Sequence, residues 1–325
     1  MQHIPVLLQE VIAGLQAKKS EVILDATVGG GGHSEALCKA IGEGTFVCLD
    51  ADEEAILRSR KRLEVCNCEF LFYQTNYRHL DTALAELGIT GINRALFDLG
   101  LSSFQLDPPA GGSGRGFSFM RDESLLMTFA KNTPPADLPA EASAQAGDGT
   151  VYDYSSAPLG RGDTTLTAKT IVNEWSEDTI TTLLESYGEE KQARRIARKI
   201  VEAREHSRIS TSFQLAEIVE SVVKRKGKIH PATKTFQALR IAVNDEFQGL
   251  KDGLKKAWDV LLPQGRIAVI SFHSMEDRVV KDFFRELGKT EAGKVVTKKP
   301  IVPTQEEVAR NSRSRSAKLR IIEKY

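Results

Sequence analysis

The first hundred residues alternate between short apolar runs and stretches with helical character. Apolar runs occupy residues 22–28, 45–49, 69–73 and 95–99, and helical stretches at 33–40, 52–63 and 80–87 separate them. Strands that alternate with helices along a chain typically form a parallel sheet with helices on both faces. The sequence therefore predicts an α/β fold for this part of the chain.

The pattern changes after residue 106. Residues 107–163 are rich in Pro, Gly, Ala and Ser, and we expect a flexible loop at 131–165. Helical patterns return at 168–175, 177–187, 189–204 and 212–223. One long helix is expected after His230-Pro231, with an apolar stripe through Phe236, Leu239, Val243, Phe247, Leu250 and Leu254. After a turn at 263–265, strands are expected at 266–272, 295–297 and 317–322. A mainly helical domain, 107–229, thus interrupts a sheet domain made of 1–106 and 230–325.

The charge of the chain excludes some classes of protein. The 325 residues carry 44 Lys and Arg against 44 Asp and Glu, which excludes a uniformly basic nucleic-acid coat and an acidic tail protein. The charges are unevenly spread, with net −5 over residues 1–100, +8 over 191–234 and +6 over 289–325. One of the two basic segments could therefore meet a polyanion.

The cysteines and the apolar pattern indicate the compartment. Cys38, Cys48, Cys66 and Cys68 include one close pair and no histidine cluster at zinc-ligand spacing, so neither a structural zinc site nor a disulfide framework is expected. No apolar run reaches the roughly 18 residues of a membrane span, and the first residues lack the pattern of a secretion signal. We expect a reduced, soluble, cytoplasmic protein without a metal or a membrane contact.

A run of four glycines, residues 29–32, follows the first predicted strand directly. Such a turn lets the backbone approach a ligand at the N-terminus of the next helix, although glycine turns also serve tight packing alone. Asp50 stands at the end of the second strand, where a carboxylate can accept hydrogen bonds from both hydroxyls of a ribose. Together these residues favour a cofactor that contains a nucleoside.

The acidic residue before the glycines narrows the choice of cofactor. The run only approximates the dinucleotide pattern G-x-G-x-x-G, and Asp25 would be poorly placed beside a pyrophosphate. It suits a cationic or zwitterionic ligand such as S-adenosylmethionine better, unless it simply caps the glycine turn. Asp98 ends the fourth strand, so Asp25, Asp50 and Asp98 should converge on one crevice. Tyr77 could pack on an adenine there or belong to the core.

Six segments carry a resemblance to a known family: residues 3–11, 25–33, 98–103, 115–122, 230–240 with 244–246, and 270–278. In this order they resemble the bacterial methyltransferases (RsmH, also called MraW) that modify N4 of a cytosine in 16S ribosomal RNA. The resemblance runs from residue 3 to 322 and is lost around 124–165.

The resemblance implies a fold, a cofactor and a partner. The fold is the class I S-adenosylmethionine-dependent methyltransferase (Rossmann-like) sheet with an inserted helical domain, and the partner is 16S ribosomal RNA or the small ribosomal subunit. S-adenosylmethionine is expected to be bound by residues matching Gly31, Gly32, His33, Asp50, Tyr77, Asp98 and Gln105, with Asp25 beside them. Asp98 is expected to act as a cofactor ligand or as an acceptor for the amine.

This sequence departs from the family at two places. Phe104 replaces a usual proline, and residues 123–129 differ from the usual motif and precede about thirty extra residues. An alternative is therefore a ribosome-assembly protein that binds RNA and has lost turnover. A third interpretation, a nucleotide-dependent oxidoreductase, has little support because no phosphate-binding pattern is present.

Basic residues cluster on one predicted helix and beyond it. Arg194, Arg195, Arg198 and Lys199 lie mostly opposite the apolar face of the helix at 189–204. Such a face is often merely solvated, but the net +8 segment favours a surface for RNA phosphates. The expected RNA-binding residues are these four and Lys228, His230, Lys234 and Arg240, and the basic residues at 310–320 could extend the surface. His273 and Ser274 could face the crevice, although 274–277 also fits a helix capping box.

Overall fold

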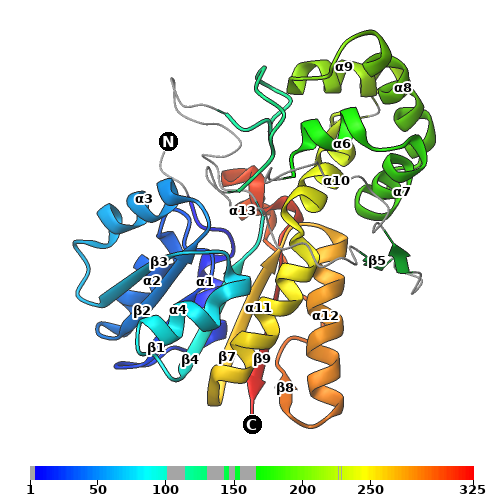
Figure 1. The fold of residues 1–325 in the computed structure, drawn as a ribbon. Helices are drawn as coiled ribbons and strands as arrows, with labels where there is room; N and C mark the ends of the chain where they lie inside the picture. The colour runs from blue at the N-terminus through cyan, green and yellow to red at the C-terminus, as the bar shows by residue number, and fades with distance from the viewer. Residues whose placement is uncertain are drawn as a thin grey trace. The chain divides into compact units, whose positions relative to one another are not determined.

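The computed structural model describes residues 4–100, 114–129, 143–145, 151–153, 166–225, 227 and 229–325. The chain forms two compact units, residues 1–102 with 247–325, and residues 103–246. Figure 1 shows the first unit in blue to cyan and in yellow to red. Gln105 and Lys228 lie outside the described residues. So does the loop expected at 131–165, apart from a short antiparallel pair, β5 (Ser143–Gln145) and β6 (Val151–Asp153).

The first unit is built on a seven-stranded sheet in the order β3-β2-β1-β4-β7-β9-β8. Its strands are β1 (Val22–Asp25), β2 (Thr45–Asp50), β3 (Glu69–Gln74), β4 (Ile92–Asp98), β7 (Leu261–Ser271), β8 (Gly293–Val295) and β9 (Lys318–Lys324). The first five pair in parallel, and β9 runs antiparallel to both of its neighbours. The predicted α/β class is confirmed, and the strand order reverses between β1 and β4.

Helices cover both faces of this sheet, as Figure 1 shows. One layer contains α1 (Leu8–Leu15), α2 (Gly32–Ile41) and α3 (Glu53–Leu63). The other contains η1 (Tyr77–His79), α4 (Leu80–Glu86), α11 (Glu246–Val260) and α12 (Ser274–Lys289). Alternate residues of a strand serve the two layers: Ile23 packs toward the first and Leu24 toward the second. Burial on both faces explains why the strands read as apolar runs.

The last strands return the chain to the edge of the sheet. Within β7, the predicted turn is a bulge: Gln264 has φ 62°, and the pairing with β4 jumps from Leu261 to Arg266. Between β8 and β9 lie α13 (Gln305–Arg310) and η2 (Ser312–Ser316).

The second unit is mainly helical, as predicted from the sequence. It contains α6 (Ala168–Glu174), α7 (Glu177–Gly188), α8 (Ala193–His206), α9 (Ser212–Val222) and α10 (Thr233–Asn244). Helix α8 begins four residues later than expected, because Glu189 takes a left-handed conformation, with φ 46°, and ends α7.

The single long helix expected after Pro231 is wrong. Asp245 has φ 46° and separates α10 from α11, although the apolar stripe continues across the break. Asp tolerates this left-handed conformation because its short polar side chain can bond locally. The break coincides with the boundary between the two units, so residues 230–246 belong to the helical unit rather than to the last sheet segment.

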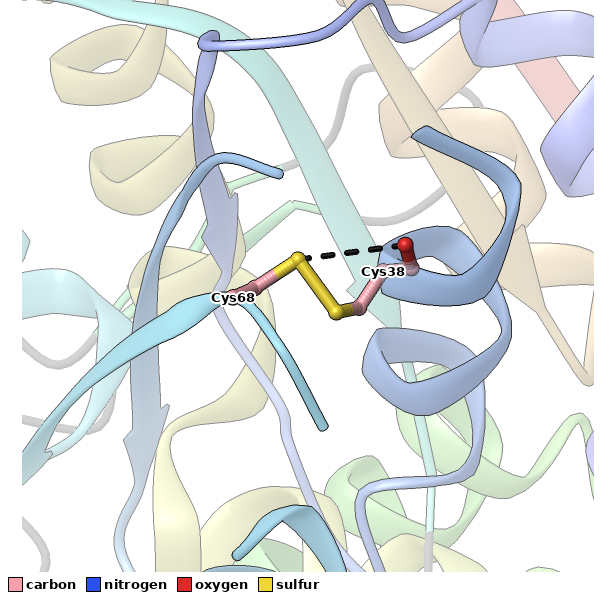
Figure 2. Close-up of a disulfide and its surroundings, with 2 residues drawn as sticks. All are labelled: Cys38 and Cys68. Carbon is pink, nitrogen blue, oxygen red and sulfur yellow. Dashed lines mark hydrogen bonds between the residues drawn. A yellow bond between two sulfur atoms is a disulfide. The ribbon is translucent and has the colours of Figure 1, made fainter. Parts of the chain in front are cut away.

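The cysteines also depart from expectation. Cys38 on α2 and Cys68, just before β3, form a disulfide, with their Cα atoms 6.0 Å apart (Figure 2). Sequence spacing could not reveal this pair, because the cysteines are 30 positions apart and meet only when the chain between them folds into β2 and α3. Cys48 and Cys66 are free thiols. Across the described residues, no helix has the length and apolar character needed to span a membrane.

Candidate active site

The carboxyl ends of β1, β2 and β4 carry Asp25, Asp50 and Asp98. Adjacent parallel strands place these ends at one edge of the sheet, and β1 and β4 flank the point where the strand order reverses. Ligands of open α/β sheets bind beyond such an edge. The predicted convergence of the three carboxylates therefore agrees with the observed topology.

Asp50 fixes the glycine turn to the end of β2. The Gly29 N–H donates to Asp50 Oδ2 at 2.9 Å, and the Asp52 N–H donates to Oδ1 at 2.9 Å. Burial raises the pKa of Asp50 to about 6, although these two hydrogen bonds act to lower it. Each carboxylate oxygen keeps one lone pair, so Asp50 can still accept two hydroxyl donors.

The turn itself leaves no room for larger side chains. Gly31 has φ 73° and precedes the first residue of α2. At Gly32, a Cβ atom would lie 2.5 Å from Cγ of Pro5. Glycine is therefore required at Gly31 for its backbone conformation and at Gly32 for the close approach of the N-terminal segment.

Asp25 is almost completely buried, with 2% of its surface exposed. Its Oδ2 accepts a 2.5 Å hydrogen bond from the Ser34 hydroxyl, and its Oδ1 accepts from the Thr27 N–H at 3.3 Å. Burial raises the pKa of Asp25, while these bonds oppose the rise. These contacts are the turn-capping contacts considered from the sequence.

His33 lies between the N-terminal segment and the end of β4. Its Nε2 is 3.0 Å from the Val6 carbonyl oxygen, and its Nδ1 is 3.6 Å from Asp98 Oδ2. Burial lowers the pKa of His33. The glycine turn thus leads directly into a buried imidazole that faces the strand-terminal carboxylate.

Asp98 has one buried oxygen, Oδ1, that makes no hydrogen bond to any residue that the structure describes. Its backbone N–H donates to Thr27 Oγ1 at 2.7 Å. Burial raises the pKa of Asp98 to about 7, and the Glu276 carboxylate adds to the rise. A buried oxygen without a partner costs free energy unless a ligand or water satisfies it.

The N-terminus of α12 contributes a residue that the sequence analysis did not select. Glu276 is 3% exposed, and its Oε2 accepts from the Phe272 N–H at 2.8 Å and the His273 N–H at 3.3 Å. His273 is the N-cap, so the expected capping box exists but starts one residue earlier than predicted. The spacing of Ser274 and Asp277 indicated a capping box near this position, whereas no sequence signal placed Glu276 near Asp98.

Tyr77 has core contacts. Its ring meets Phe97 edge-on at 5.7 Å, and a Cβ on Gly253 would come within 2.8 Å of its Cδ2. The ring is therefore held between the sheet and α11, which is the core interpretation considered above.

The basic residues predicted on α8 are exposed. Arg194, Arg195, Arg198 and Lys199 lie opposite the buried Ala193, Ile196, Ala197 and Ile200. Two of these cations have acidic neighbours, Arg198 with Glu177 and Lys199 with Glu202. The predicted division of this helix into a basic and an apolar face is confirmed.

The other basic candidates differ in exposure. Lys234 is exposed and donates to the Glu189 carbonyl oxygen at 2.6 Å. His230 stacks on Phe119 at 4.1 Å and contacts Glu220 at 2.8 Å. Arg240, only 12% exposed at its side chain, makes a bidentate ion pair with Glu246.

Of the basic residues expected at 310–320 to extend the surface, Arg310, Arg313 and Arg315 are exposed, but the expectation is wrong for Arg320. Arg320 lies on β9 with 7% exposure and is paired with Asp277. Because its guanidinium is buried in the sheet unit, it cannot belong to a solvated phosphate-binding face.

Comparisons with known proteins agree with the resemblance in the sequence. The model of the MraW methylase family matches residues 1–138 and 161–325. The ribosomal RNA small subunit methyltransferase H of Persephonella marina is 40% identical, over 99% of this chain and 98% of that protein. Its namesake from Finegoldia magna is 36% identical over 99% and 98%. The crystal structure of an rRNA methylase from Streptococcus thermophilus aligns with a TM-score of 0.41 at 11% identity, covering 100% and 98% of the two chains.

Proposed function

Because the chain belongs to the MraW methylase family, whose methyl donor is S-adenosylmethionine, we propose that it methylates the exocyclic N4 of a cytosine in 16S ribosomal RNA. The curated relatives that support this proposal are named as small-subunit ribosomal RNA methyltransferases and match over nearly their whole length. The observation that carries it is the buried Oδ1 of Asp98 at the sheet edge, which has no hydrogen-bond partner among the described residues.

The residues at this edge fit S-adenosylmethionine. Asp50 would hold the two ribose hydroxyls, and the glycine turn with Gly31 and Gly32 would pass close to the cofactor at the start of α2. No phosphate has to be accommodated, which agrees with the acidic surroundings. When bound, the cofactor supplies an activated methyl group on a sulfonium. Tyr77 and Gln105 are proposed as further cofactor contacts on the family resemblance alone.

Asp98 is proposed to act on the acceptor amine. The lone pair of a cytosine amine is delocalised into the ring, so the nitrogen is a weak nucleophile. A carboxylate oxygen that accepts its N–H favours a nucleophilic shape and offsets the developing positive charge. The buried Oδ1 of Asp98, to which no described residue donates a hydrogen bond, has the chemistry for this role. Asp25 would act as a positioning residue, because Ser34 and Thr27 occupy its oxygens.

The helical unit is proposed to hold RNA. One face of α8 consists of the exposed cations Arg194, Arg195, Arg198 and Lys199. Such a face neutralises phosphates, and its affinity for RNA falls as the salt concentration rises. Lys234, His230 and Lys228 are proposed to extend this face. Arg240 is proposed only to position its neighbours, since Glu246 occupies its guanidinium. A target base must leave its stack to reach a cofactor site at a sheet edge.

The decisive experiment is methyl transfer to small ribosomal subunits that lack the modification. A labelled methyl group from S-adenosylmethionine should appear as N4-methylcytidine, identified by mass, and both Asp50→Ala and Asp98→Ala should abolish it. Asp282→Ala, on a 46% exposed side chain of α12, is the matched control and should keep the activity. Cofactor binding without any product in the unaltered protein would refute the proposal and support an assembly factor without turnover.

The RNA surface is tested by neutralising charge. Arg194→Gln with Arg195→Gln should raise the KM for subunits about tenfold and lower the salt slope of binding by about 2, one for each lost phosphate contact. Lys255→Gln with Arg285→Gln, two exposed cations of the sheet unit, is the control. Equal effects of the two double variants would contradict a specific surface on α8.

A further inference from the structure

The hydrogen bonds of His33 determine which of its nitrogens carries a proton. Nε2 lies 3.0 Å from the Val6 carbonyl oxygen, which can only accept, so Nε2 must be protonated. A neutral imidazole has a single proton, and burial favours the neutral form. Nδ1 of neutral His33 therefore presents a lone pair.

That lone pair points at another acceptor. Nδ1 is 3.6 Å from Asp98 Oδ2, and both side chains are largely buried, with 7% and 20% exposure. This separation is longer than a hydrogen bond, so the two groups interact through their charges: a proton on either one removes the repulsion between the lone pair and the carboxylate. The proton can sit on Asp98 or on Nδ1, and in either case the pair as a whole is neutral.

The charges around the pair favour retention of this proton. Asp25 on β1 interacts with both members, and Glu276 on α12 acts on Asp98. Arg62 on α3 acts on His33 in the opposite sense. Asp25 acts to raise the pKa of His33 and Glu276 that of Asp98, whereas Arg62 lowers that of His33, so the neighbouring charges set the pH at which the pair loses its proton.

We infer that His33 and Asp98 bind one proton between them, and that the deprotonated pair is the acceptor of the proton that leaves the methylated nitrogen. The inference rests on the proposed function. The nitrogen lone pair forms the new N–C bond while the C–S bond breaks and its electron pair stays on sulfur. An N–H bond then breaks, its electron pair stays on nitrogen, and the proton binds between Asp98 and Nδ1 before it passes to water.

His33 and Asp98 must be deprotonated as a pair before they can accept a proton. The rate of methyl transfer should therefore rise about tenfold per pH unit below the midpoint of the pair's titration and level off above it. A cofactor ligand or structural residue would produce no such profile in a single turnover with bound cofactor.

The first measurement is the ¹⁵N NMR titration of the histidines in the full chain, with the His33 signals assigned by His33→Gln. We expect a protonated Nε2 throughout and a titration at Nδ1 that is lost in Asp98→Asn, because the amide can donate to Nδ1 but cannot ionise. Glu276→Gln keeps the acceptor for the Phe272 and His273 N–H groups but removes a charge. It should move the midpoint to lower pH, whereas Asp282→Asn should not.

The second measurement compares that midpoint with the pH profile of single-turnover methyl transfer. The same shift in Glu276→Gln by both methods supports the inference. A proton on Nδ1 with Nε2 bare, or a titration unaffected by Asp98→Asn, would overturn the shared proton. A shared proton with a flat pH profile would overturn its role as acceptor. Absence of any methyl product, with the NMR titration as expected, would instead reject the proposed function and leave the shared proton standing.

Discussion

Arg320 on β9 and Asp277 on α12 form a buried bidentate ion pair, with Nε 2.6 Å from Oδ1 and Nη2 3.2 Å from Oδ2. Asp277 follows Glu276 directly, so this pair fixes the first turn of the helix that places a carboxylate near Asp98. A strand two positions away from β4 in the sheet thus helps to place the carboxylate that adds to the raised pKa of Asp98.

Removal of one partner should be costly. Arg320→Met leaves the buried Asp277 carboxylate with only the longer contact from Lys318 and should lower the free energy of unfolding by about 3–5 kcal/mol. Lys318→Met is the matched control: Lys318 also contacts Asp277, at 3.4 Å, but is 34% exposed, so a loss below about 1 kcal/mol is expected. Urea unfolding of both variants measures the difference. Similar losses would show that burial of the Arg320 pair is unimportant.

The same pair should respond to acid. Burial would raise the pKa of Asp277, but the hydrogen bonds and charge of Arg320 outweigh it and hold the pKa below its ordinary value. A depressed carboxyl pKa contributes stability above the unfolded pKa, about 3.9, and the contribution is lost as pH falls through the folded pKa. The deficit of Asp277→Asn should therefore be largest above pH 4 and shrink in more acidic solution. A deficit independent of pH would contradict this account.

Asp50 should make cofactor binding depend on pH. Its pKa is raised to about 6 by burial, and donors such as ribose hydroxyls favour the ionised carboxylate. Affinity for S-adenosylhomocysteine should therefore increase as pH rises through 6. Asp50→Asn should weaken binding about tenfold to hundredfold at pH 8 and remove this dependence. Calorimetry at several pH values tests both points, and an unchanged pH dependence in Asp50→Asn would assign it to another group.

The raised pKa has the opposite consequence for folding. A carboxyl whose folded pKa exceeds its unfolded value contributes stability that is complete below the unfolded pKa and is lost as pH rises through the folded one. Without ligand, Asp50→Asn should gain stability relative to the original chain between pH 4 and 6 and keep that advantage above. The protein thus gives up some stability at Asp50 to hold a charge at the sheet edge.

The glycine turn offers a test with an internal control. Gly32→Ala places a methyl group 2.5 Å from Pro5 Cγ, so the N-terminal segment must move, at about 1–3 kcal/mol. At Gly30, nothing lies within 4 Å of an added Cβ, and Gly30→Ala should be nearly neutral. Thermal unfolding and the His33 NMR signals report the two effects. Equal destabilisation would show that flexibility of the turn, rather than the approach of Pro5, is the reason for glycine.

The disulfide predicts the chemistry of the thiols. In denaturant without reductant, two thiols, Cys48 and Cys66, should be alkylated, and all four after reduction. In the native protein only the partly exposed Cys66 should react, because Cys48 is completely buried. Reduction should cost about 3–4 kcal/mol from the entropy of the closed loop. Four reactive thiols without reductant would refute the Cys38–Cys68 bond.

Much of the sheet unit could be predicted from its sequence because its strands are buried on both faces. The strands at 22–25 and 45–50 have no solvent-facing side, so they read as continuous apolar runs that end at Asp25 and Asp50. Strand-terminal carboxylates were therefore found together with the strands. The basic face of α8 was predictable for a related reason, since Arg194 and Ile196 alternate with the period of a helix.

The features that the sequence did not reveal depend on contacts between distant residues. Glu276 and Asp98 are brought together only when α12 packs against the sheet, and Cys38 meets Cys68 only after β2 and α3 have formed. Asp245 is a different case. The helix breaks there, but the apolar stripe continues through both helices, so the pattern gives no sign of the break. The polar side chain of Asn244, next to the break, is hydrogen-bonded to the Met127 carbonyl and the Phe129 N–H.

The segment around Val6 has a consequence for how the protein matures during synthesis. Val6 orients His33, the neighbouring Leu7 N–H donates to Glu307 Oε1 at 2.8 Å, and the Asn311 amide donates to the Ile4 carbonyl at 3.1 Å. The N-terminal segment is therefore held by hydrogen bonds to residues that are translated some three hundred codons later. A nascent chain that has not yet released α13 therefore lacks the hydrogen bonds that tie Ile4 and Leu7, on either side of the segment that contacts His33, to the end of the fold.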